Sequence, residues 1–196
     1  MGYQEFTIEG RNAVIEAFRS GKTIDKLYIL DGCQDGPIVT IKREAKKGDT
    51  LIKFVTKERL DQMSETGHHQ GVIAVSAAYD YSEMEDIFAL AEERGEAPFI
   101  IICDELEDPH NLGAIIRSAE AGGAHGVIIP KRRNASLNYV VGKASAGAVE
   151  YVPVARVANL ASTIEELKKR GVWIYAADMD GENWCQADYA GGVGLV

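Results

Sequence analysis

Two polar side chains in residues 99–130 have the chemistry and the setting of a reactive site. Asn111 and Arg117 are six residues apart and follow an acidic loop that a proline interrupts. A guanidinium is a permanent cation that can stabilise a developing oxyanion, and a carboxamide can orient the cation or a substrate. Asn111 could instead cap a helix. Arg117 could instead pair on the surface with Glu107 or Asp108, and the spacing alone leaves both explanations open.

The elements around these side chains follow a β-α-β pattern. Phe99–Cys103 is an apolar, mostly β-branched run typical of a buried strand, and residues 126–129 form a second run of this kind. Between them, apolar residues recur at helical spacing from Leu112 to the glycine pair at 122–123. In open α/β sheets, ligands bind where strands end and helices begin. Because helix side chains lean toward the N-terminus, Arg117 could reach over that junction.

Residues 104–130, DELEDPHNLGAIIRSAEAGGAHGVIIP, resemble the first signature motif of the SpoU/TrmH family of RNA ribose 2′-O-methyltransferases in the SPOUT superfamily. Two further pieces, GRNAVIEAF at 10–18 and HHQGVIA at 68–74, resemble the N-terminal domain found in many members. That domain resembles a small ribosomal protein and is thought to hold the RNA. The resemblance covers nearly the whole chain and is to the type that methylates a guanosine of 23S ribosomal RNA.

Pattern and resemblance together predict an α/β protein of two domains. Residues 1–76 alternate β-α-β-α-β-α-β and should form a small ribosomal-protein-like α/β domain that binds the RNA substrate. Residues 77–97 read as an acidic linker that becomes a surface helix. Residues 98–196 should form an α/β-knot methyltransferase domain with a mostly parallel sheet. Its later elements are predicted as a strand at 149–154, a helix over 159–170, a buried strand at 173–176 and a last strand from Gly191.

The resemblance also implies segments beyond Val196. In the family, these are threaded into a trefoil knot that builds most of the cofactor site and much of the dimer interface. We therefore expect the 196-residue chain to be a piece of a longer protein and to be inactive alone.

The composition limits where RNA could bind. The chain has 21 Lys or Arg against 30 Asp or Glu, a net charge of −9, so RNA must meet a local patch rather than a field of the whole molecule. No apolar run reaches membrane-spanning length, and the first residues have no secretory signal pattern. Three widely spaced cysteines favour reduced thiols in a cytoplasmic protein. Their spacing to the histidines predicts no metal site.

Four residues of the first domain are candidates for RNA contact. Arg11 and Asn12 follow Gly10 at a helix start, where backbone N–H groups favour anions. His69 and Gln70 lie in a loop between two glycines, where the backbone can approach a ligand closely. The residues alone leave open that Asn12 is a cap and Gln70 a solvated turn residue, and the resemblance favours substrate contact.

In the second domain, a basic cluster of Lys131, Arg132 and Arg133 follows the strand that ends at residue 130. It should lie at the same sheet edge as Asn111 and Arg117, which makes it a phosphate candidate, although a solvated loop is the ordinary alternative.

The small-residue stretch 139–148 resembles the family's lysine/serine-alanine-glycine stretch near the active site, which adds Lys143 and Ser145 to the RNA-binding candidates. Its alanines, Ala144, Ala146 and Ala148, are expected to serve close helix packing. The resemblance also assigns Ala177 and Asp178, after the predicted strand 173–176, to one wall of an S-adenosylmethionine pocket.

The implied activity is transfer of a methyl group from S-adenosylmethionine to a ribose 2′-hydroxyl of ribosomal RNA, or of transfer RNA, by a homodimer without metal. Arg117 would stabilise the developing alkoxide, and Asn111 would orient Arg117 or the ribose. One alternative is a truncated, non-catalytic RNA- or ribosome-binding protein. Another is a magnesium site for phosphoryl chemistry at the acids of residues 104–108, which lacks the expected phosphate-binding glycine loop.

Overall fold

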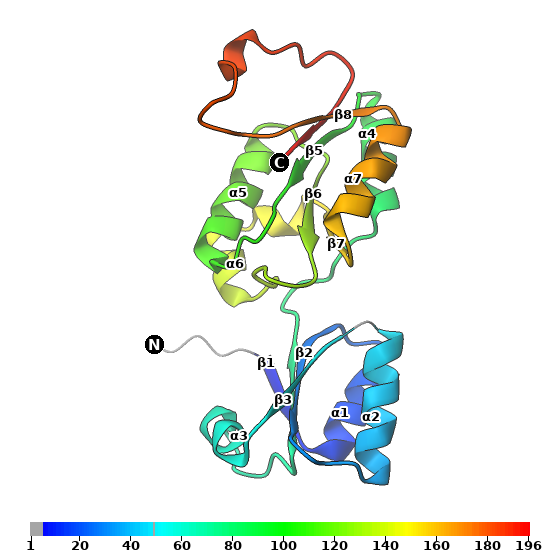
Figure 1. The fold of residues 1–196 in the computed structure, drawn as a ribbon, viewed down its shortest axis with the longest axis vertical. Helices are drawn as coiled ribbons and strands as arrows, with labels where there is room; N and C mark the ends of the chain where they lie inside the picture. Colours follow the sequence, from blue (N-terminus) through cyan, green and yellow to red (C-terminus); the bar gives the residue numbers. More distant parts are fainter. Residues whose placement is uncertain (1–5, 49) are drawn as a thin grey trace. The chain divides into compact units, whose positions relative to one another are not determined.

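Two structural units, which divide after Asp80, make up the chain in the computed structural model (Figure 1). The structure describes residues 6–48 and 50–196. None of the helices in this described part has the length and hydrophobicity that a membrane span requires.

The first unit is a mixed sheet with helices on its two faces. In chain order its described elements are β1 (Phe6–Glu9), α1 (Arg11–Arg19), β2 (Ile24–Leu30), α2 (Gly36–Lys47), β3 (Leu51–Val55), α3 (Lys57–Met63) and β4 (Val72–Ser76). The strand order is β1-β4-β2-β3, in which β2 and β3 run parallel and β4 runs antiparallel to both of its neighbours. The predicted alternation of strands and helices is confirmed.

Helices α1 and α2 cover one face of this sheet, and α3 lies on the other face (Figure 1). Val14 of α1 and Ile38 and Ile41 of α2 are fully buried in one cluster with Leu27 and Ile29 of β2. These strand residues alternate in the sequence, as a half-buried strand requires, so the apolar pattern of β2 places it beneath both helices.

The second unit is a parallel α/β sheet. Its described elements are α4 (Met84–Arg94), β5 (Phe99–Ile102), α5 (Pro109–Ala121), β6 (Gly126–Pro130), α6 (Tyr139–Ala144), η1 (Ala148–Glu150), β7 (Val154–Val157), α7 (Leu160–Lys169), β8 (Val172–Tyr175), η2 (Trp184–Gln186) and β9 (Gly192–Leu195). The strand order is β7-β6-β5-β9-β8, with every pair parallel. The predicted α/β class with a mostly parallel sheet is confirmed.

Helices α5 and α6 lie on one face of this sheet, and α4 and α7 lie on the other (Figure 1). Ile87 of α4 and Leu167 of α7 are buried together with Ile100, Ile102 and Ile128 of the two central strands. The acidic segment predicted as a linker therefore contributes a helix whose apolar side packs in the second unit.

The start of α5 differs from the prediction. The helix begins at Pro109, and Asp108 is its N-cap, because the Asp108 carboxylate accepts a hydrogen bond from the His110 N–H at 2.9 Å. Proline is favoured at the first helical position and aspartate at the cap, so this pair is a stronger start signal than Asn111. Asn111 consequently lies inside the first turn, and Arg117 lies on the third turn.

Two later predictions are also corrected. Residues 149–154 were expected to form a strand, but Ala148–Glu150 is a 3₁₀ turn that follows Gly147 at φ +89°, and the strand β7 starts only at Val154. The strand over 173–176 was expected to be buried. It is the edge strand β8, where Trp173 is 68% exposed, because β9 inserts between β5 and β8 and is the single neighbour of β8 among the described strands.

Gly113 of α5 permits close contact with α6. A Cβ atom at this position would lie 2.5 Å from the Ala144 Cβ and 2.8 Å from the Val141 carbonyl oxygen. Both neighbours are backbone or rigid, so they cannot move aside as a flexible side chain would. Within the predicted packing stretch, Ala144 meets α5 and Ala148 is buried, whereas Ala146 is exposed at φ +52°.

We predict that Gly113→Ala destabilises the protein although alanine is the better helix former. Overpacking of this contact should lower the free energy of unfolding by about 1–3 kcal/mol. Gly36→Ala is the matched control, since Gly36 is also helical and a Cβ there would meet nothing within 4 Å. Urea denaturation measures both variants, and equal stabilities would refute the packing role of Gly113.

Candidate functional site

The loops that follow β5 and β6 are joined at the edge of the sheet where both strands end. The Ala135 N–H donates to the Leu106 carbonyl at 2.8 Å, and the Leu106 N–H donates to Asn134 Oδ1 at 3.0 Å. An ion pair joins the same loops, with 2.6 Å between Arg133 Nη1 and Glu105 Oε1. These contacts make the two loops one surface, which lies next to the start of α5.

Asn111 and Arg117 are both exposed on α5. Neither side chain has a hydrogen bond or an ion pair with any part of the chain that the structure describes, so the surface pairing considered for Arg117 is absent there. Six residues along an α-helix correspond to about 120° around its axis and about 9 Å along it. The structure therefore leaves both groups accessible but directs them to different sides of α5.

Not all of the positive charge in the basic cluster is available to a ligand. Glu105 neutralises Arg133, and its hydrogen bond and charge raise the pKa of the guanidinium. Arg132 is exposed, and the described residues hold no ion-pair partner for it. The Lys131 N–H donates to the Val157 carbonyl at 2.9 Å, which ties the start of the cluster to β7. Glu105 is a residue that our sequence reasoning missed as a partner of the cluster.

The two candidates near α6 have different surroundings. Lys143 is exposed on the last turn of α6. Ser145 is buried, and its hydroxyl donates to the Gly142 carbonyl at 2.9 Å. This bond satisfies the Gly142 carbonyl at the end of α6, which is a structural role for Ser145. The predicted contact of Ser145 with RNA stays a prediction.

Ala177 and Asp178 line a pocket of about 1250 Å³ beside β8 and β9. The segment 176–191 rises from the end of β8 and returns to β9 (Figure 1). The Ala177 N–H donates to the Val196 carbonyl at 2.9 Å, and the Tyr175 hydroxyl donates to the Asp188 carbonyl. The rings of Tyr175 and Tyr189 lie 4.9 Å apart, so aromatic and apolar groups form much of the wall.

Two of the four acids after β5 have structural partners. Asp108 caps α5, and Glu105 pairs with Arg133. Among the described residues, no group of three or more His, Cys, Asp or Glu side chains gathers as it would around a metal ion.

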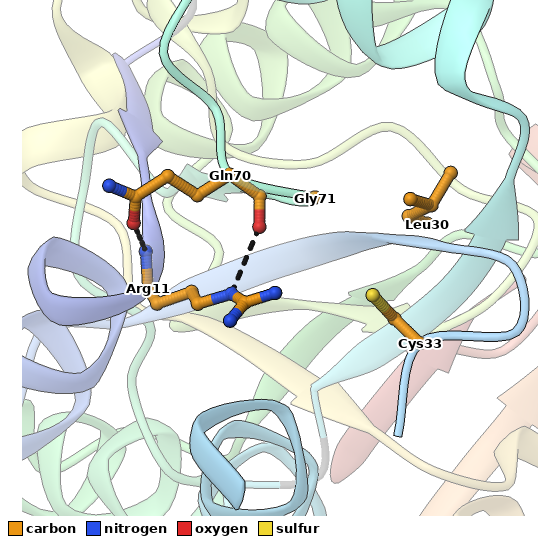
Figure 2. Close-up of a pocket in the computed structure, with 5 residues that line it drawn as sticks. All are labelled: Arg11, Leu30, Cys33, Gln70 and Gly71. Atoms are coloured by element: carbon orange, nitrogen blue, oxygen red, sulfur yellow. Dashed lines mark hydrogen bonds between the residues drawn. The ribbon is translucent and has the colours of Figure 1, made fainter. Parts of the chain in front are cut away.

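In the first unit, Arg11 and Gln70 meet across 59 residues of sequence (Figure 2). The Arg11 N–H donates to Gln70 Oε1 at 3.1 Å, and Arg11 Nε donates to the Gln70 carbonyl at 3.1 Å. Gly10 has no side chain to cap α1, so the distant Gln70 carboxamide satisfies the first helical N–H in its place. Arg11 Nη2 also pairs with Asp35 Oδ2 at 2.7 Å.

Asp35 is a second residue that sequence reasoning missed. It caps α2 by accepting from the Ile38 N–H at 3.3 Å, and the Asp35-Gly36-Pro37 start signal could have identified that role. Its pairing with Arg11 depends on the tertiary structure.

His69 and Asn12 are placed differently. His69 is buried, where its Nδ1 accepts from the Gly71 N–H at 3.0 Å and its Nε2 lies 2.9 Å from Asp61 Oδ1. Because Nδ1 accepts, Nε2 carries the proton and donates to Asp61. The buried His69 ring therefore holds its own loop in place through Gly71 and Asp61. Asn12 is exposed on the first turn of α1, and Gln70, not Asn12, provides the cap.

Comparisons with known proteins agree on both units. Residues 98–196 match the family model of the SpoU rRNA Methylase family, and residues 7–82 match a model described as RNA 2′-O ribose methyltransferase substrate binding. The chain is 49% identical over 178 residues to YacO of Bacillus subtilis, a protein named provisionally as a TrmH family tRNA/rRNA methyltransferase. The aligned residues are 91% of this chain and 71% of that relative. A similarly named protein of Staphylococcus haemolyticus is 44% identical over 177 residues, which are 90% of this chain and 71% of that protein.

Two solved structures share the fold. One is an AdoMet-bound rRNA methyltransferase from Sinorhizobium meliloti, with a TM-score of 0.50 and 24% identity over 97% of this chain and 69% of that chain. The other is the SpoU methyltransferase AviRb from Streptomyces viridochromogenes in complex with AdoMet, with a TM-score of 0.51 and 20% identity over 97% of this chain and 72% of that chain.

We predict that Gln70→Ala lowers the free energy of unfolding by about 0.5–2 kcal/mol, because the first N–H of α1 loses its acceptor. Gln70→Glu keeps an acceptor oxygen and should retain most of the stability. Gln62→Ala, an exposed glutamine on α3, is the control. Thermal and urea unfolding measure the three variants, and a Gln70→Ala protein as stable as the control would refute the capping role.

We also predict that the thiols differ in reactivity. Burial raises the pKa of Cys103, at the end of β5, to about 11, whereas Cys185 is exposed. At pH 8 a disulfide reagent should modify Cys103 roughly 100-fold more slowly than Cys185, since only the thiolate reacts. Peptide mass spectrometry after timed labelling separates the sites, and the Cys103 rate should climb up to about pH 11. Equal rates at pH 8 would contradict the buried position of Cys103.

Proposed function

Because the chain belongs to the SpoU/TrmH family of RNA methyltransferases, we propose that it transfers a methyl group from S-adenosylmethionine to a ribose 2′-hydroxyl of ribosomal RNA. The ribose specificity is supported by the substrate-binding model that residues 7–82 match. The ribosomal substrate is supported by the description of the family model, while the names of the relatives keep transfer RNA as the alternative.

The observation that carries this proposal is the accessible guanidinium of Arg117 on the helix that follows β5, which has no partner in residues 6–48 and 50–196. A ribose hydroxyl is a weak nucleophile, and negative charge develops on its oxygen as the hydroxyl proton leaves to solvent. Formation of the bond to the methyl carbon, with release of the sulfur, then removes that charge. Arg117 is always protonated, so it serves this step as an electrostatic stabiliser of the oxygen rather than as a base. An unpaired cation supplies this charge without first breaking another ion pair.

Asn111 has a separate role in this proposal. Its position about 120° around α5 from Arg117 favours contact with the ribose or the neighbouring phosphate over contact with the guanidinium. A carboxamide both donates and accepts hydrogen bonds, so it suits a sugar hydroxyl. The exposed Arg132 beyond β6 supports this arrangement as a phosphate contact at the same sheet edge.

The pocket lined by Ala177 and Asp178 fits the cofactor in size and in chemistry. Its volume of about 1250 Å³ accommodates a nucleoside-sized molecule, and its Tyr175 and Trp184 walls suit a purine ring. The carboxylate of Asp178 can accept hydrogen bonds from sugar hydroxyls or an ammonium group. Bound S-adenosylmethionine would supply an electrophilic methyl group there.

The proposal includes the homodimer expected from the family. Trp173 on the edge strand β8 is 68% exposed, and an indole of this exposure is typical of residues that a partner covers.

We predict that Arg117→Ala in the complete protein reduces turnover by about 100-fold or more, the scale of losing one donor to a developing oxyanion. Cofactor affinity should stay within about twofold, because Arg117 lies outside the pocket beside β8. Arg94→Ala, an exposed arginine at the end of α4, is the matched control.

Transfer of a labelled methyl group to an unmodified ribosomal RNA transcript measures turnover, and nucleoside mass spectrometry identifies the methylated atom. Normal turnover by Arg117→Ala would refute the catalytic assignment. Base methylation, or transfer only to transfer RNA, would refute the proposed specificity. RNA binding without any transfer would favour the non-catalytic alternative.

A further inference from the structure

A pocket in the first unit lies beside the Arg11–Gln70 contact, and a residue with no assigned role organises it. It has a volume of about 500 Å³ and lies between β1, the start of α1 and the loop 64–68. Asn12 and Ala13 line it from the helix, Glu9 from the strand, and His68 and Gln70 from the loop side.

The Glu9 carboxylate holds the loop 64–68 in place. Glu9 Oε1 accepts from the Glu65 N–H at 2.6 Å and from the Thr66 N–H at 3.4 Å. Glu9 Oε2 accepts from the hydroxyls of Ser64 and Thr66, both at 2.5 Å. One side chain at the end of β1 thus satisfies four donors that lie 55 to 57 residues later in the sequence.

The same hydroxyls extend the network through the loop. Ser64 Oγ accepts from the Gly67 N–H at 2.9 Å, and Thr66 Oγ1 accepts from the His68 N–H at 3.2 Å. Burial disfavours ionisation of Glu9, but these hydrogen bonds outweigh it and lower the pKa of the carboxyl group. An ionised Glu9 therefore sets the loop shape that places His68 and Gln70 beside Asn12.

The charge of the pocket decides what it can bind. Among the residues that the structure describes, its lining holds the carboxylates of Glu9 and Glu65 and no lysine or arginine. A phosphate would be repelled there, whereas an uncharged group with donors and acceptors would not. The exposed Asn12 carboxamide, the Gln70 amide nitrogen, which points away from Arg11 (Figure 2), and the exposed His68 ring are suited to that group. Unpaired RNA bases are recognised by such hydrogen bonds and by stacking on planar side chains.

We propose that this pocket receives the base and ribose of one unpaired nucleotide of the RNA substrate, and that Glu9 is the positioning residue that shapes it. The inference rests on the proposed function, because it takes the substrate to be RNA. It adds a recognition site for the neutral part of a nucleotide, separate from the cationic groups that meet phosphates.

The first test is Glu9→Gln in the complete protein, with Glu16→Gln as the control. Glu16 is an exposed acid on α1 whose partner is the surface residue Arg19. Gln at position 9 cannot accept from all four donors, so the loop should loosen. The KM for an unmodified ribosomal RNA transcript should rise about tenfold, with kcat and cofactor affinity within about twofold. Hydrogen exchange at residues 64–68 should accelerate.

Ala13→Leu provides a second variant that leaves the Glu9 network intact. It fills the pocket from an exposed helical position, so it should raise the KM for RNA by a similar factor without changing hydrogen exchange of the loop. NMR of the side-chain amides of Asn12 and Gln70 provides a readout without catalysis. Adenosine or uridine should shift these signals more than the same nucleoside 5′-phosphates, and inorganic phosphate should not shift them.

Unchanged KM values in both variants, with normal methyl transfer by the parent protein, would overturn this proposal and leave the proposed function standing. Larger shifts with inorganic phosphate than with nucleosides would overturn the assigned ligand chemistry. A parent protein that transfers no methyl group to RNA would overturn the proposed function, and shifts with nucleosides alone would then still support the pocket.

Discussion

The parallel direction of all five strands in the second unit is the constraint on which its candidate site depends. Because every strand runs the same way, the loops after β5, β6 and β8 leave the sheet at one edge. Hydrogen bonds of Leu106 to the loop after β6 then join two of these loops, and the Glu105–Arg133 ion pair neutralises one charge on each of them. Close packing of α5 on α6 at Gly113 fixes the position of the helix that carries Arg117.

In the first unit, distant side chains satisfy backbone groups that local residues leave open. Gln70 caps α1 because Gly10 cannot, and Glu9 accepts from four donors of the loop 64–68. His69 supports the same segment from a buried position. These contacts preorganise a polar surface at which the exposed Asn12 can meet a ligand. Such a surface loses less conformational entropy on binding than a flexible loop would.

The electrostatics of the chain are local rather than global. A net charge of −9 does not attract RNA, and even the basic cluster after β6 is partly neutralised, since Arg133 pairs with Glu105. Cations that stay unpaired among the described residues, such as Arg117 and Arg132, therefore stand out as sites for negative charge. The acidic pocket beside Glu9 complements them, because it favours the uncharged part of a nucleotide.

Apolar periodicity and turn residues in the sequence were sufficient to predict most elements of both units, and the resemblance of residues 104–130 predicted the family. These signals are short-range, so they also predicted Gly122 as a helix end. The helix start near Asn111 was predicted wrongly because Asp108 and Pro109 form the stronger start. The burial of the strand at Trp173 was predicted wrongly because that strand lies at an edge of the sheet. Only the tertiary structure decided that β9 inserts between β5 and β8, that Asp35 pairs with Arg11 and that Glu9 holds the loop 64–68. Each of these contacts joins residues far apart in the chain, and no local pattern specifies which distant donors and acceptors will meet.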